Sequence, residues 1–183
     1  MQQPVRDIAV IGCGHWGKNL IRNFANFGRL GFVCDEDQKR SVQFAKEYGV
    51  QNLSWGSVLE SKNITAVVIA APASIHAKLV EEALHANKHV FVEKPLALTH
   101  EEGLLLCKLA SAKKRILMVG HLLHYHNAFL ELKRMIEKGE LGNIRHIYSN
   151  RLNLGKIRRE EDILWSFAPH DISVILNFFN ESP

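Results

Sequence analysis

Apolar and polar positions along this chain fall into two kinds of segment. Short apolar runs, rich in β-branched and aliphatic side chains, are separated by longer segments whose apolar residues recur at helical spacing. The short runs are DIAVIG (7–12), LGFVCD (30–35), TAVVIAAP (65–72), KHVFVEKP (88–95) and RILMVG (115–120). Strands that alternate with helices in this way are typical of βαβ units, so we expect an α/β fold built on a parallel sheet.

Two of the intervening segments have the pattern of amphipathic helices. In residues 74–87, apolar side chains recur on one helical face, and Ser74 is the candidate N-cap. Residues 99–114 open with Thr99 and Glu102 at capping-box spacing. We expect both helices to pack on the sheet.

The composition is that of a globular protein. The 183 residues are 46% hydrophobic and 23% charged, which is enough apolar material for a sizeable core. No window approaches the roughly 18 to 20 apolar residues of a membrane span, and the N-terminus lacks the basic start and apolar core of a signal peptide. We therefore expect a cytoplasmic protein that does not associate with membranes.

Neither the cysteines nor the net charge changes this interpretation. Cys13, Cys34 and Cys107 occur singly within apolar stretches, whereas disulfide frameworks and metal sites show paired spacings. The formal net charge is +4 and the pI is near 9.0, but the basic residues are spread along the chain. This distribution favours a solvated surface or a site for an anionic substrate over nucleic-acid binding.

The first strand is followed by a glycine motif with G-x-G-x-x-G spacing. Such glycines allow a tight turn, close approach of a pyrophosphate and close packing of the next helix, whose N-terminus faces the phosphates. An aspartate ends the second strand, where its carboxylate can accept hydrogen bonds from the adenosine ribose and would repel a 2′-phosphate. NAD is therefore favoured over NADP. The candidate cofactor-binding residues of this region are Gly12, Gly14, His15, Trp16, Gly17 and Asp35.

Two further motifs lie where strands are expected to end. In an open parallel sheet, ligands bind beyond the carboxyl ends of the strands. Ala71 and Pro72 follow one apolar run, and Glu93 and Lys94 follow another, so these residues are candidates for the cofactor cleft. Without the glycine motif, Lys94 would be interpreted as a lysine in solvent. Trp16 either packs beneath the nicotinamide or fills the core, and the sequence favours neither.

Four motifs, in this order and spacing, resemble those of the Gfo/Idh/MocA oxidoreductases, which are named for glucose-fructose oxidoreductase and inositol dehydrogenase. They are AVIGCGHWGKN (9–19), APASIHAKLVEEAL (71–84), KHVFVEKPLA (88–97) and FAPHDISVIL (167–176). Within the family, residues 142–172 are most similar to the branch that oxidises C3 of nucleotide-linked amino sugars or uronates in surface-polysaccharide pathways.

The resemblance implies an NAD-dependent sugar dehydrogenase with two domains. Residues 1–122 would form a Rossmann NAD-binding domain, and residues 123–183 would begin an incomplete α+β substrate domain. Lys94 matches the family lysine that orients the reacting hydroxyl, and His170 matches the histidine that acts as acid or base. Many members carry an aspartate four residues before this histidine, where this chain has Ser166. That departure favours His170 itself as the base.

The chain is much shorter than family members usually are, so we expect a truncated substrate domain. A fragment, a truncated reading frame and one product of a split gene remain alternatives. The strand expected from Ile144 would then be an exposed edge with few partners. An inactive NAD-binding fragment or regulatory module is the alternative function, and the full-length form is expected to be a homo-oligomer. Lys156 and Arg158 either meet the pyrophosphate or carboxylate of the sugar substrate or lie in a solvated loop.

Histidines elsewhere receive simpler interpretations. His121, His124 and His126 invite a zinc hypothesis, but no cysteine or carboxylate nearby completes a ligand set, so we expect no metal. His76 is expected to hydrogen-bond a helix to a loop rather than to act in catalysis.

Overall fold

The computed structural model describes residues 5–150, 152 and 163–179, and these fall into two compact units, Met1–Gly120 and His121–Pro183. Each unit is described by itself. The domain boundary expected from the sequence, after residue 122, stays a prediction.

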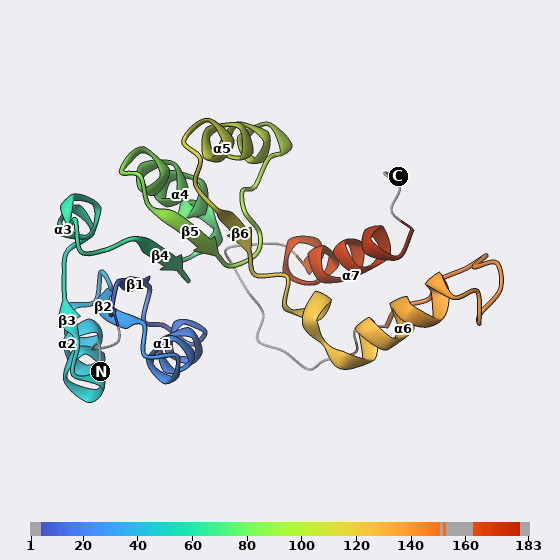
Figure 1. The fold of residues 1–183 in the computed structure, drawn as a ribbon, viewed down its shortest axis with the longest axis horizontal. Helices are drawn as coiled ribbons and strands as arrows, with labels where there is room; N and C mark the ends of the chain where they lie inside the picture. The colour runs from blue at the N-terminus through green and yellow to red at the C-terminus, as the bar shows by residue number, and fades with distance from the viewer. Residues whose placement is uncertain (1–4, 151, 153–162, 180–183) are drawn as a thin grey trace. The chain divides into compact units, whose positions relative to one another are not determined.

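The first unit is built on a parallel sheet (Figure 1). Its six strands have the order β3-β2-β1-β4-β5-β6, and every neighbouring pair is parallel. This is the order of a dinucleotide-binding Rossmann sheet, so the predicted fold class is confirmed. The strands are β1 (Ile8–Ile11), β2 (Leu30–Cys34), β3 (Gln51–Asn52), β4 (Ala66–Ile69), β5 (His89–Val92) and β6 (Leu117–Val119). The short strand β3 was not predicted.

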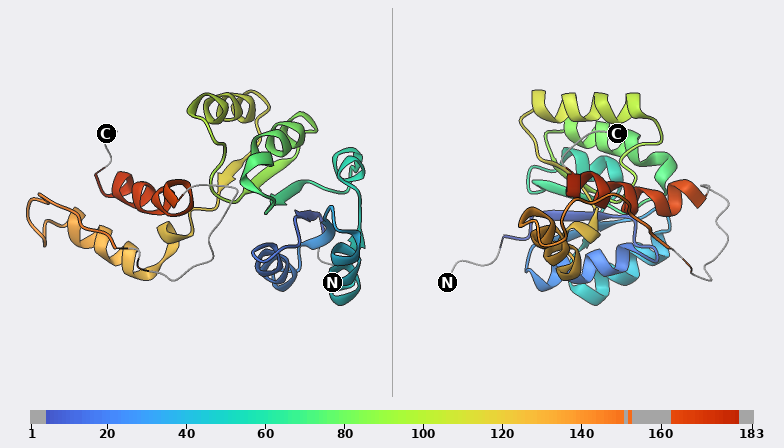
Figure 2. Two further views of the ribbon diagram at one scale, coloured as in Figure 1. Left: turned by 180° about the vertical axis from the view of Figure 1, so that it is seen from behind. Right: turned by 90° about the vertical axis from the view of Figure 1, so that its right-hand side faces the viewer.

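Helices cover both faces of this sheet (Figure 2). They are α1 (Gly17–Asn26), α2 (Gln38–Tyr48), α3 (Trp55–Glu60), the 3₁₀ helix η1 (Ala73–Ile75), α4 (His76–His85) and α5 (His100–Ala112). Thr99 caps α5 by accepting the Glu102 N–H, as predicted. The expected Ser74 cap is wrong, because Ser74 lies inside η1 and α4 begins only at His76.

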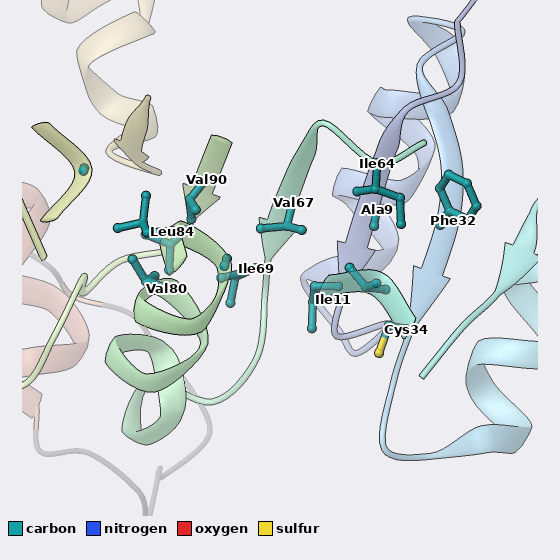
Figure 3. Close-up of a cluster of buried hydrophobic side chains, with 14 of the residues drawn as sticks. Ala9, Ile11, Phe32, Cys34, Ile64, Val67, Ile69, Val80, Leu84 and Val90 are labelled. Atoms are coloured by element: carbon teal, nitrogen blue, oxygen red, sulfur yellow. The ribbon is translucent and has the colours of Figure 1, made fainter. Parts of the chain in front are cut away.

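Because successive strand residues point to opposite faces, the sheet has two cores. The core against α3, α4 and α5 includes Ile11, Ile69 and Leu84, each at most 5% exposed (Figure 3). The core against α1 and α2 includes Val10 and Ile21, which are fully buried. Burial of one such side chain contributes about 1.5 to 3 kcal/mol, so the two cores hold the carboxyl ends of the strands in place.

The regular elements among the described residues of the second unit are helices. They are η2 (Leu122–Tyr125), α6 (Asn127–Glu137) and α7 (Ile163–Phe179), which contains Pro169. The strand expected from Ile144 is wrong for residues 144–150, which are neither helical nor extended in a sheet. A strand needs a neighbour to satisfy its backbone groups, and none of the described residues of this unit supplies one. In the part of the chain that is described, no helix is both long enough and apolar enough to cross a membrane.

Candidate functional site

The glycine turn between β1 and α1 has no room for side chains at its first and third glycines. Gly12 has φ +90°, and a Cβ there would lie 2.6 Å from the Ala70 carbonyl oxygen. A Cβ on Gly17 would overlap the carbonyl of Gly12. At Gly14, in contrast, a Cβ would meet only the Arg40 guanidinium, at 3.8 Å. The turn is therefore packed closely on β4 but open at Gly14, where a pyrophosphate has to approach.

The N-terminus of α1 adds backbone donors to this turn. Trp16 is its N-cap residue, but no side chain makes a capping hydrogen bond there. Lys18 and Asn19 donate their N–H groups to the carbonyls of Gly14 and Trp16, and the positive end of the helix dipole at this N-terminus attracts anions. His15 and Trp16 are both exposed beside this helix end. The predicted turn thus fits the phosphates of a dinucleotide.

Asp35 lies directly after β2 and is held by the backbone of the glycine turn. Its side chain is 8% exposed, and its two oxygens accept hydrogen bonds from Cys13 N–H at 2.6 Å and Asp37 N–H at 2.8 Å. A carboxylate has about four lone-pair directions, so further acceptor capacity remains for ribose hydroxyls. Their binding by Asp35 stays a prediction.

Arg40 is a site neighbour that the sequence reasoning missed. Its guanidinium lies 3.6 Å from the Asp35 carboxylate and 3.3 Å from that of Asp37, near Gly14. Arg40 is in the first turn of α2, five residues after Asp35. Placing that turn at the end of β2 would have indicated the contact. The negative charge of Asp35 is therefore partly offset by a cation.

The two strand-end motifs lie beside the glycine turn. The Trp16 indole N–H donates to the Glu93 carboxylate, with Nε1 and Oε1 2.5 Å apart. Trp16 is 43% exposed, so the interpretation of this residue as a core filler is wrong. Lys94, half-buried, follows Glu93 and precedes Pro95 through a cis peptide bond. The predicted candidates after β1 and β5 thus lie together.

Burial determines the electrostatics of Glu93. Desolvation raises the pKa of its carboxyl group, while the Trp16 indole, the Lys94 backbone N–H and the charges of Lys94 and His76 act in the opposite direction. Burial also raises the pKa of the Cys13 thiol to about 12 and that of Cys34 to about 11. Both thiols are therefore protonated and poor nucleophiles near neutral pH, as expected for structural cysteines.

His76 is a buried residue that lies between the loop of Ala71 and the loop that carries Lys94. It is 1% exposed, and its Nδ1 and Nε2 lie 2.7 Å from the Pro95 carbonyl oxygen and 2.8 Å from that of Ala71. The hydrogen-bonding role predicted for His76 is confirmed. The His76 ring thus lies between the loop of Ala71 and the exposed Pro72 and the loop that carries Lys94, with a nitrogen within hydrogen-bonding distance of a carbonyl oxygen in each.

The remaining candidates lie in the second unit. His170 is a half-buried residue of α7, and Ser166 belongs to the same helix. Because the two units are described separately, the convergence of His170 with Lys94 stays a prediction. Lys156 and Arg158 lie outside the described residues. Within the described ranges, no group of three metal-ligating side chains forms a metal site.

Comparison with known proteins adds a family match to this geometry. Residues 6–121 match a family described as an oxidoreductase family with an NAD-binding Rossmann fold. The chain is 36% identical over 152 residues to scyllo-inositol 2-dehydrogenase (NAD(+)) of Bacillus subtilis, covering 78% of this chain and 43% of that protein. It is 29% identical over 175 residues to UDP-N-acetylglucosamine 3-dehydrogenase of Acidithiobacillus ferrooxidans, covering 95% and 54%.

A solved structure agrees in fold. Scyllo-inositol dehydrogenase from Lactobacillus casei, with bound NAD(H) and scyllo-inositol, superposes with a TM-score of 0.82. The alignment covers 96% of this chain and 56% of that one at 21% identity, which establishes a shared fold alone. The chain spans about half the length of the curated relatives it matches.

Proposed function

The chain belongs to the Gfo/Idh/MocA oxidoreductase family, and on that premise we propose that it supplies the NAD-binding half of a dehydrogenase acting on the hydroxyl group of a sugar or polyol. One observation carries the proposal. The glycine turn, the loop of Ala71 and the loop of Lys94 are joined at one edge of the sheet by the contacts of Trp16 and His76. This edge is where the carboxyl ends of β1, β4 and β5 meet, and where Rossmann sheets bind dinucleotides.

In this mechanism the side chains of the protein orient the substrate and move its proton. The NAD nicotinamide, when bound, accepts a hydride. The Lys94 ammonium would hold the reacting hydroxyl oxygen, and the His170 imidazole would take the hydroxyl proton, since an imidazole titrates near neutral pH. Both groups would have to reach the same substrate oxygen, within about 3 Å.

We propose C3 of a nucleotide-linked amino sugar or uronate as the reacting position. The similarity to UDP-N-acetylglucosamine 3-dehydrogenase spans nearly the whole chain and supports this choice. The relative that acts on scyllo-inositol is more identical over a shorter range, so cyclitols belong in the same assay. Surface-polysaccharide synthesis in the cytoplasm, with the enzyme as a homo-oligomer, is the setting we propose.

The test is a turnover assay of the 183-residue chain. Purified protein is mixed with NAD and a panel of UDP-linked amino sugars, UDP-linked uronates and inositols, and NADH is followed by absorbance. NADH formation with one class supports the dehydrogenase and identifies its substrate. Calorimetric NAD binding without turnover favours the inactive NAD-binding module, for which the replacement of the usual aspartate by Ser166 is the supporting observation.

Variants then test the assigned residues. Lys94→Ala and His170→Ala should each lower turnover on the order of 100-fold or more, with NAD affinity little changed. The exposed Lys46 in the last turn of α2 provides a matched control, because Lys46→Ala removes the same charge at the helix end remote from the carboxyl end of β2. Turnover at the wild-type rate in His170→Ala would contradict its role as the base.

A further inference from the structure

The hydrogen bond between Trp16 and Glu93 spans the carboxyl end of a strand that lies between them. Trp16 follows β1 and Glu93 follows β5, and β4 pairs with both of these strands. The two residues are 77 positions apart in the sequence. Their bond therefore connects the glycine turn directly to the loop that carries Lys94, across the strand edge where the nicotinamide half of a dinucleotide would lie.

The Glu93 carboxylate is confined on several sides. A Cβ on Gly120 would lie 3.0 Å from its Oε1 and 3.2 Å from its Cδ, so the carboxylate lies directly over the end of β6. The Lys94 backbone N–H also donates to it. A carboxylate that accepts hydrogen bonds from the indole and from the next residue, and that packs close to Gly120, fixes the backbone from which the Lys94 side chain extends.

We propose that Trp16 is a positioning residue for Lys94, acting through its hydrogen bond to Glu93. Binding of a cofactor at the glycine turn and the position of Lys94 are then coupled. The Trp16 indole belongs to the glycine turn, and its hydrogen bond holds the residue that precedes Lys94. This inference rests on the proposed function for the role of Lys94, but the coupling itself is a property of the first unit.

Burial does not account for the position of this indole. A tryptophan that is 43% exposed gains less from apolar burial than one in a core, so its polar contact is what orients it. The same unit contains a comparable pair elsewhere: the Trp55 indole N–H donates to the Glu82 carboxylate at 2.6 Å, between α3 and α4. We call the carboxyl ends of β1, β4 and β5 with their loops the cofactor edge. Trp55 lies in a segment that adds no residue to this edge, so the pair is a matched control.

The test measures amide hydrogen exchange of the full chain by mass spectrometry, in a peptide covering residues 93–98. Trp16→Phe keeps the ring but removes the N–H, and it should raise exchange in this peptide about fivefold. Trp55→Phe should leave this peptide unchanged. Glu93→Ala should raise exchange at least as much, because it also removes the acceptor of the Lys94 backbone N–H, and adding Trp16→Phe to Glu93→Ala should give no further increase.

Two results would overturn the proposal: wild-type exchange in Trp16→Phe, or an equal increase in Trp55→Phe. Where the wild type turns over, Trp16→Phe should lower kcat about tenfold with a smaller change in the KM for NAD. If Trp16 had a merely structural role, Trp16→Phe would lower thermal stability without a larger change in kcat than in KM. If no substrate is turned over, the proposed function fails while the exchange experiment still decides whether the two loops are coupled.

Discussion

The two units of this protein differ in how they hold the residues on which function is proposed to depend. In the first unit, strand residues such as Val10, Val67 and Ile69 are fully buried between two layers of helices. In the described part of the second unit, Val174 at 6% is the one apolar side chain that is buried, whereas Ile172 in the same helix is 50% exposed. The cofactor edge is therefore supported by the two buried cores of the sheet. His170, in contrast, lies on a helix with little buried surface.

This difference indicates that the chain carries two levels of local stability. Local unfolding is easiest where few apolar side chains are buried and backbone hydrogen bonds are exposed to solvent. Cofactor binding should then be a property of the first unit, and the arrangement around His170 should be the part that opens first. Four experiments test this comparison.

The largest expected effect is on proteolysis. A low protease concentration should cut within residues 121–183 long before it cuts within 1–120, because cleavage follows the population of locally open states. Mass spectrometry over a time course should detect a stable core that ends near Gly120. First cuts within the parallel sheet, or a chain that resists cleavage throughout, would show that the two units are equally stable.

The next effect is on the free energy of unfolding. Ile69→Ala removes a fully buried side chain from β4 and should cost about 2 to 5 kcal/mol. Ile172→Ala, at an exposed position of α7, should change the stability by less than about 0.5 kcal/mol. Urea denaturation followed by circular dichroism measures both. Equal costs at the two positions would mean that the second unit contributes as much packing as the first.

A smaller effect concerns cofactor preference. NAD should bind more tightly than NADP, and Asp35→Ser should narrow the ratio of the two affinities on the order of tenfold, because the charge that repels a 2′-phosphate is lost. Arg40→Met should widen the ratio, since the guanidinium next to this carboxylate is removed. Calorimetry with both cofactors measures the ratio. His170→Ala is the control from the second unit, and a changed ratio there would contradict the assignment of cofactor binding to the first unit.

The smallest effect is a pH dependence at Glu93. Because burial raises the pKa of this carboxyl group in the folded state, ionisation costs stability there. The penalty is absent below the ordinary glutamate pKa of about 4.3 and appears as the pH rises through the raised value. Relative to Glu93→Gln, the wild type should thus lose stability as the pH rises above the ordinary glutamate pKa, until the carboxyl group is ionised in the folded state as well. Urea midpoints at several pH values measure this, and a constant difference would contradict it.

Sequence patterns predicted the sheet and the glycine turn because both depend on local features. Apolar runs are buried wherever they occur in the sequence, so they indicate the strands. The spacing of Gly12, Gly14 and Gly17 indicates the backbone conformation of the turn. The prediction of a strand from Ile144 was wrong, because alternation of apolar and polar residues does not by itself supply a neighbouring strand for pairing. The bond from Trp16 to Glu93 was not predictable either, since it joins segments that only the strand order brings together.

The strand order also determines when the first unit can assemble on the ribosome. β1 is synthesised first, yet its edge at Ile8 pairs with Ala66 of β4 and stays open until that strand has emerged. At about 5 to 20 residues per second, the delay after β2 lasts a few seconds. An open strand edge is a template for association with other chains. Gly12, which packs on the Ala70 carbonyl, completes its turn only when this edge closes, so the glycine turn forms at the moment the nascent chain stops being vulnerable there.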